Sequence, residues 1–91
     1  MDEIDDLLSS IHDHLEATED VPMETEASRW LGEAQAVAED VAHADLDEET
    51  VHERVETILE LLEETETTGN ETADEHVDAA RRAARRVLER R

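Results

Sequence analysis

Carboxylates and histidines are the side chains of this chain that could do chemistry. There are 28 Asp and Glu and five His among 91 residues. Glu49, His52 and Glu56 stand three and four residues apart, a spacing that puts them on one face of a helix. Carboxylate and imidazole groups at this spacing could hold a divalent metal ion or transfer protons. These three residues are therefore the first candidates for a metal site.

A solvated acidic face is the simpler interpretation of the same pattern. With 28 acidic residues, pairs at helical spacing are unavoidable. A di-iron bundle needs Glu-x-x-His on two helices, and Glu49 with His52 is the one copy in the sequence. His12 and His14 lie two residues apart, so they point to different sides of a helix. We therefore expect no bound metal and no cofactor, and keep the carboxylate–histidine metal bundle as an alternative.

Nucleophilic catalysis has no support in the sequence. The serines lack the glycine elbow that exposes a nucleophile, and two glycines are too few for a phosphate-binding loop. There is no Cys, which excludes disulfides and thiolate chemistry. We predict that the protein is not an enzyme and has no catalytic residues.

The arginines gather at the C-terminus. Six of the eight Arg lie in the last eleven residues, whereas residues 1–80 carry 27 acidic residues against two Arg. A basic helix could bind nucleic acid, but the acidic remainder would repel phosphate. We expect pairing with acidic groups instead, within the chain (Arg82 with Asp78, Arg85 with Glu89) or with a partner. The candidate partner-binding residues are Arg81, Arg82, Arg85 and Arg86.

The charge balance indicates the solvent in which the chain works. Its formal net charge is −20, and it has no Lys. Self-repulsion on this scale opposes folding in dilute buffer but is screened in molar salt. We therefore predict a halophilic protein in the cytoplasm of a salt-accumulating haloarchaeon. The acidic N-terminus lacks the basic start of a signal peptide, and no apolar run is long enough for a membrane span.

Apolar periodicity indicates the elements that must position these groups. The spacing predicts an all-α fold, a single domain over residues 1–91, in which three to four short helices form an antiparallel bundle. Asp47 is the expected N-cap of the third helix, and Thr72 with Glu75 form a capping box for the fourth. Trp30 is expected in the core, and Gly32 where another backbone or the Trp30 ring comes close. The predicted helices cover about residues 2–17, 25–43, 48–66 and 73–89.

A thin core favours association. Four short amphipathic helices bury little apolar surface alone, so we expect a homodimer. The alanine-rich fourth helix or the N-terminal helix is the candidate surface, and the N-terminal helix could pack on its own bundle or on a partner subunit. Amphipathic helices with a charged rim suit a non-enzymatic protein–protein interaction or structural module. That is the predicted function; a metal-binding bundle and a nucleic-acid accessory protein are the alternatives.

A family resemblance rests on two strings, TEASRWLGEAQAVAED at residues 25–40 and TGNETADEHVDAARRAARRVL at residues 68–88. Their W-L-G-E-A and D-E-H-V-x-A-A-R cores resemble those of an uncharacterised family of small acidic helical proteins from haloarchaea. The resemblance covers the chain from about His12 onward. It implies a helical domain and no activity.

Overall fold

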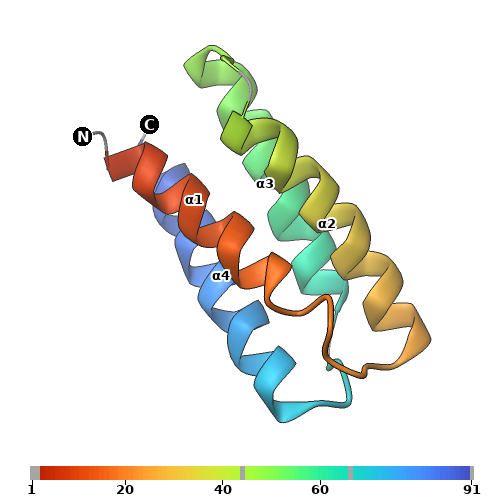
Figure 1. The fold of residues 1–91 in the computed structure, drawn as a ribbon. Helices are drawn as coiled ribbons and strands as arrows, with labels where there is room; N and C mark the ends of the chain where they lie inside the picture. The colour runs from red at the N-terminus through yellow and green to blue at the C-terminus, as the bar shows by residue number, and fades with distance from the viewer. Residues whose placement is uncertain (1–2, 44, 66, 91) are drawn as a thin grey trace.

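The fold is a four-helix antiparallel bundle. A computed structural model describes residues 3–43, 45–65 and 67–90, and none of these residues lies in a strand. Each helix packs against two neighbours, α1 and α3 both lying against α2 and α4, with successive helices running in opposite directions (Figure 1). The all-α antiparallel bundle predicted from periodicity is confirmed. The helices are α1 (Glu3–Glu16), α2 (Thr25–His43), α3 (Glu48–Glu64) and α4 (Glu71–Glu89).

The core is built from one apolar stripe on each helix. On α1, Leu8, Ile11 and Leu15 are at most 7% exposed. This N-terminal stripe, which was a candidate surface for a partner subunit, is covered by α2 and α4 of the same chain. The alanines of α4 at 80, 83 and 84 are buried in the same cluster. Of the α1 stripe, Ile4 at the N-terminal end is only partly buried.

Side-chain caps set where two of the helices begin. The Asp47 carboxylate accepts a hydrogen bond from the Thr50 backbone N–H at 2.8 Å, as predicted for the N-cap of α3. The capping box predicted at Thr72 is wrong. The Asn70 side-chain oxygen accepts from the backbone N–H groups of Thr72 and Ala73, so α4 begins two residues earlier than expected. The third helix ends at Glu64, and the expected end, residue 66, lies outside the described residues.

Trp30 does not fill the core, which corrects our expectation. It is partly exposed and lies outside the core cluster. The buried stripe of α2 consists of Leu31 and Val41 with the small residues Ala27, Ala34 and Ala38. Trp30 stands on the flank of that stripe, so Ala27, Leu31 and Ala34 face the neighbouring helices in its place. The side chain instead lines a shallow hollow near the α3–α4 connection.

The two connections at one end of the bundle are joined. The backbone N–H of Glu24 donates to the carbonyl of Thr68 at 2.9 Å, which links the α1–α2 and α3–α4 connections. The Asp74 carboxylate accepts hydrogen bonds from the backbone N–H and the hydroxyl of Thr68, both at 2.8 Å. Gly69 makes the turn with a φ of 79°. We call this the closed end.

The opposite end of the bundle is splayed. The N-terminal half of α1 and the α2–α3 connection diverge there, as the ribbons show (Figure 1). The N-terminus of α1 and the C-terminus of α4 lie at this same end, where Arg86 of α4 and its C-cap residue Arg90 pair with Glu3 of α1. We call it the open end. None of the helices among the described residues is both long and apolar enough to cross a bilayer.

Candidate functional site

A groove of about 370 Å³ occupies the open end. Leu8 is buried beneath it, and three further apolar residues are partly buried around it. A second hollow of about 280 Å³ shares Leu8, Leu46 and Val51 with the groove and extends it towards the C-terminal turn of α2. The end groove, as we call the two together, is lined on its apolar floor by Ile4, Leu8, Val41, Ala42, Leu46 and Val51.

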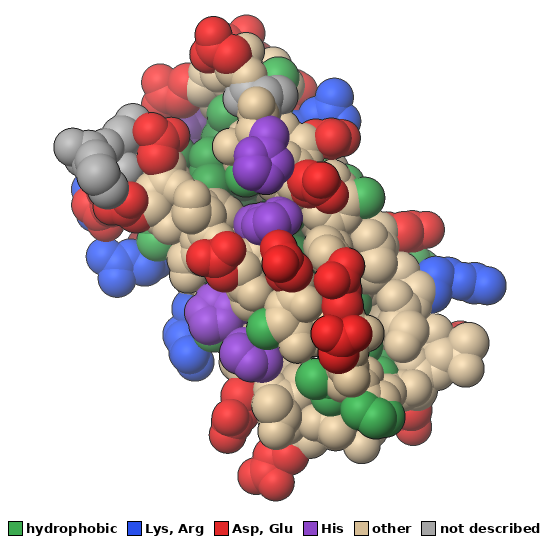
Figure 2. All heavy atoms as spheres, viewed as in Figure 1, with side chains coloured by type: hydrophobic (Ala, Val, Ile, Leu, Met, Phe, Trp, Pro, Cys, Tyr) green, Lys and Arg blue, Asp and Glu red, His purple; other side chains and the backbone are tan. Residues whose placement is uncertain are grey.

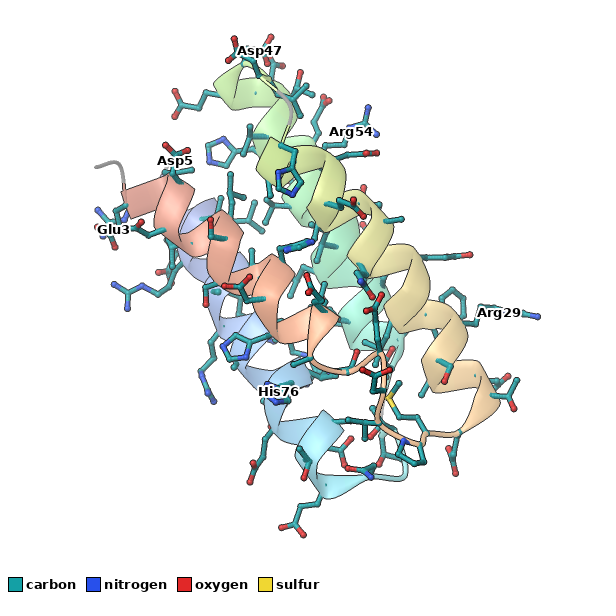
Figure 3. All side chains as sticks on the ribbon, viewed as in Figure 1. Glu3, Asp5, Arg29, Asp47, Arg54 and His76 are labelled. Carbon is teal, nitrogen blue, oxygen red and sulfur yellow. The ribbon has the colours of Figure 1, made fainter. Side chains whose placement is uncertain are left out.

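The rim of the end groove is acidic. Asp5 on α1 faces the side formed by Asp45 and Glu48, and all three side chains are exposed. Figure 3 shows Asp5 on one side of the open end and Asp47 on the other. Of the described residues, no Arg lines either hollow, and the buried His52 is the one histidine at their edge. An apolar floor between carboxylates is suited to an apolar group that carries positive charge beside it.

The sequence-predicted metal residues are not brought together as a ligand set. His52 is buried at 6% exposure, and its Nε2 donates to the carbonyl of Val87 at 3.2 Å. That hydrogen bond joins α3 to α4 and uses one of the two ring nitrogens. Glu49 and Glu56 are exposed. Among the residues that the structure describes, no group of three or more His, Asp and Glu side chains could hold a metal ion.

Four other histidines form two pairs that sequence reasoning missed. His14 Nδ1 lies 3.0 Å from His76 Nδ1, between α1 and α4. The His12 ring contacts the His43 ring edge-on, with centroids 5.6 Å apart, between α1 and α2. The expected divergence of His12 and His14 is therefore present, because each faces a different neighbouring helix. Histidine side chains lie in a band on one face of the bundle (Figure 2).

The C-terminal arginines pair inside the chain, but with other partners than expected. Asp78 binds Arg81, with Nη1 and Oδ1 3.1 Å apart, and not Arg82. Arg85 lies 3.9 Å from Glu63 of α3, across the helix interface. Neighbouring helices supply most of these carboxylates, because α4 carries few acidic residues near its C-terminus. Figure 3 shows Glu3 beside basic side chains at the open end.

Arg81 joins α4 to the C-terminus of α3. Its Nη2 donates to the carbonyls of Leu62 at 2.7 Å and Thr65 at 3.0 Å, at the C-terminus of α3. The last turn of α3 has no basic residue of its own, so Arg81 supplies positive charge to the negative end of that helix. Arg81 is thus committed to the bundle, whereas Arg82, Arg85 and Arg86 are exposed.

The comparison with protein families identifies the relatives of this chain. A family model described as a domain of unknown function, DUF8152, matches residues 7–91. The chain belongs to the DUF8152 family. The DUF8152 match includes α2, α3, α4 and α1 from Leu7 onward, so it covers the end groove apart from Ile4 and Asp5. It agrees with the resemblance to an uncharacterised family. No curated protein and no solved structure matches the chain.

Proposed function

We propose that this chain is a non-enzymatic interaction module that docks a cationic, amphipathic segment of another protein in its end groove. The observation that carries the proposal is the apolar floor of the groove between acidic rims at the open end. A helix or extended peptide could insert one or two apolar side chains between α1 and the α2–α3 connection. Arg or Lys beside them would meet Asp5 and Glu48.

The groove gathers incompletely covered apolar side chains around one hollow. Ile4, Leu46 and Val51 pack against the core and still line an open hollow. The corresponding side chains in the middle of the bundle, such as Ile11 and Ile58, are at most 1% exposed. Covering the groove would bury further apolar surface, which favours binding.

A homodimer remains a second proposal for the same surface. Most of the α1 stripe and the alanines of α4 are buried within the chain, so the end groove, which includes Ile4 and Leu8 of α1, is the surface that a second copy would use. Two copies carry a formal charge of −20 each, so their association requires screening by salt. We commit to a cationic segment of another protein because its charge is complementary to the rim.

The other two function classes have less support. A nucleic-acid accessory protein would use Arg81, Arg82, Arg85 and Arg86, but Arg81 is bound to α3, and Arg85 and Arg86 lie beside carboxylates. A metal centre at Glu49, His52 and Glu56 lacks an assembled ligand set among the described residues.

We further propose that the protein works in molar salt, in the cytoplasm of a salt-accumulating haloarchaeon. The chain has 28 acidic residues. On the face seen in Figure 2, acidic side chains outnumber basic ones. Screening removes the repulsion among them when the Debye length falls to about 3 Å at 1 M salt.

Binding of two designed peptides tests the docking proposal. Both carry Leu at positions i, i+4 and i+7, and they differ only in having Arg or Glu between these positions. Isothermal titration in high salt should show that the Arg peptide binds more tightly than the Glu peptide. Leu46→Glu, on the groove floor, should weaken binding of the Arg peptide by about tenfold or more.

The matched control is Ala36→Glu, which adds the same charge at an exposed position of α2 outside the groove. It should leave peptide binding unchanged. Asp5→Arg provides a second test at an exposed rim position and should weaken binding of the Arg peptide without disturbing the core. Equal binding by the parent chain and Leu46→Glu, with both folded by circular dichroism, would exclude the groove. A dimeric mass lost only in Leu46→Glu would make a second copy the occupant.

A further inference from the structure

The His14–His76 pair brings two imidazole nitrogens into direct contact from helices far apart in sequence. His14 Nδ1 on α1 lies 3.0 Å from His76 Nδ1 on α4. One ring must carry a hydrogen at Nδ1 and donate it, while the other accepts with a lone pair. Both side chains are partly exposed, so solvent and small ions reach them. His76 lies on α4 near its N-terminal end (Figure 3).

We propose that His14 and His76 form a two-ligand site for a late divalent transition-metal ion, which binds Cu²⁺ most tightly. The ligands are the two Nδ1 atoms, and water completes the coordination. When the ion binds, the shared hydrogen moves to Nε2 of the donating ring, so both rings remain neutral. This is independent of the docking groove, which lies at the open end.

The nitrogen separation suits two ligands of one metal ion. With metal–nitrogen bonds of about 2.0–2.1 Å, two ligand nitrogens at a right angle stand roughly 2.9 Å apart, whereas a tetrahedral angle requires roughly 3.3 Å. The observed 3.0 Å is set by the hydrogen bond between the rings and lies between these two values, so a small movement of the rings reaches either geometry. Sites with nitrogen ligands bind Cu²⁺ more tightly than Ni²⁺ or Zn²⁺. The site should therefore prefer Cu²⁺ over Zn²⁺ by intrinsic affinity.

Binding requires a small movement of the two rings. Their centroids are 5.2 Å apart, close to the largest separation that a 3.0 Å nitrogen contact permits, so the nitrogens now face one another almost head-on. Each ring must pivot to direct its lone pair at a shared ion. The rings are not enclosed by the core, because both residues are partly exposed.

The other histidines offer no equivalent arrangement. His43 is exposed and meets His12 ring to edge, and His12 Nδ1 faces Glu16 at 3.7 Å. His52 already donates from Nε2 to a backbone carbonyl. The carboxylates favour hard ions such as Mg²⁺, whereas imidazole suits late transition metals. Excess Mg²⁺ should thus occupy acidic surfaces and leave the His14–His76 pair available.

Metal titration of the folded chain tests the proposal. Cu²⁺, Ni²⁺ and Zn²⁺ are titrated separately by calorimetry in excess Mg²⁺, and the Cu²⁺ complex is examined by electron paramagnetic resonance. We expect one Cu²⁺ per chain with nitrogen hyperfine structure, and weaker Zn²⁺ binding. His14→Gln and His76→Gln should each lower Cu²⁺ affinity by roughly tenfold or more. Mutation of a residue that only hydrogen-bonds to a metal ligand already costs about tenfold in affinity, so loss of a ligand should cost at least as much.

His43→Gln is the matched control, since it removes an exposed histidine outside the pair. It should leave Cu²⁺ affinity unchanged. Glutamine keeps hydrogen-bonding ability at positions 14 and 76, and circular dichroism checks that both variants fold. Unchanged affinity in His14→Gln and His76→Gln, or a spectrum with oxygen ligands alone, would overturn the site.

Discussion

Arg81 performs a role that an adjacent arginine on the same helix cannot. Its guanidinium reaches two carbonyls at the end of α3, while Arg82 is exposed. Lysine would supply the charge from one nitrogen, whereas Arg81 contacts both carbonyls through Nη2 and the Asp78 carboxylate through Nη1. The positions of neighbouring arginines around α4 thus decide which of them is structural.

We predict that Arg81→Ala lowers the free energy of unfolding by about 1.5–3 kcal/mol, the usual range for hydrogen bonds to charged groups. The loss arises because the carbonyls of Leu62 and Thr65 both lose the hydrogen bond from Arg81, while Leu62 keeps the one from the Thr65 backbone N–H. Arg82→Ala is the control and should change stability by less than about 0.5 kcal/mol. Chemical denaturation in high salt measures both. Equal effects would show that only the overall charge matters.

Asp74 couples the closed end to pH. Hydrogen bonds from the Thr68 backbone N–H and hydroxyl hold the pKa of Asp74 below its usual value of 3.8. A lowered folded-state pKa means that the ionised form stabilises the fold above pH 3.8. That contribution is lost as pH falls through the folded-state pKa.

We predict that Asp74→Asn is less stable than the parent chain at neutral pH and that the difference shrinks at pH values below 3.8. Thermal midpoints at neutral pH and below pH 3.8 measure the change. High salt is used because it screens the repulsion among the other carboxylates. Glu75→Gln changes an exposed neighbour and should show no such difference. A difference that is the same at both pH values would exclude ionisation of Asp74 as its source.

The two glycines differ in whether their position requires glycine. Gly32 lies in the middle of α2, and a Cβ built on it would meet nothing within 4 Å. Our expectation of a close backbone or of the Trp30 ring at this position is therefore wrong. Gly32 points outward, one position beyond the buried Leu31. Gly69 has a φ of 79°, where a Cβ would lie 3.1 Å from Glu24 Cγ.

We predict that Gly32→Ala raises the free energy of unfolding by about 1 kcal/mol, because alanine gives up less backbone entropy in a helix. Gly69→Ala should lower it by about 1–2 kcal/mol, the cost of the left-handed conformation. Denaturant titration of the two single variants provides the comparison. A destabilising Gly32→Ala would contradict the open space around this position.

The whole molecule combines a compact bundle with a high charge density. Its radius of gyration is 12.2 Å, which agrees with about 12 Å for a compact domain of this length. This small molecule carries a formal charge of −20. The ion pairs of α4 neutralise only a few of the carboxylates.

We predict that the thermal midpoint rises steeply between about 0.1 and 1 M KCl, as the Debye length falls from about 10 to about 3 Å. A variant with Glu33→Gln, Glu39→Gln and Asp40→Asn, all exposed on α2, should show a shallower rise. Differential scanning calorimetry measures both slopes. A midpoint independent of salt in the parent chain would remove the main support for a halophilic protein.

Local pattern determined the helices and their inward faces. Leu8, Ile11 and Leu15 recur at helical spacing, and all three are buried. The Asp47 cap was also predictable, because a cap hydrogen bond joins residues three apart. Such features depend on short-range geometry, which the order of residues alone specifies.

Tertiary packing decided the features that carry the candidate sites. The His14–His76 contact joins residues 62 apart, and the Arg81 contact with Leu62 joins residues 19 apart. The periodicity of one helix cannot indicate which neighbouring helix a flanking side chain meets. Trp30 illustrates the same point, because its position at the edge of the α2 stripe allowed either burial or exposure. The end groove exists only because α1 and the α2–α3 connection diverge, which depends on how the four helices pack together.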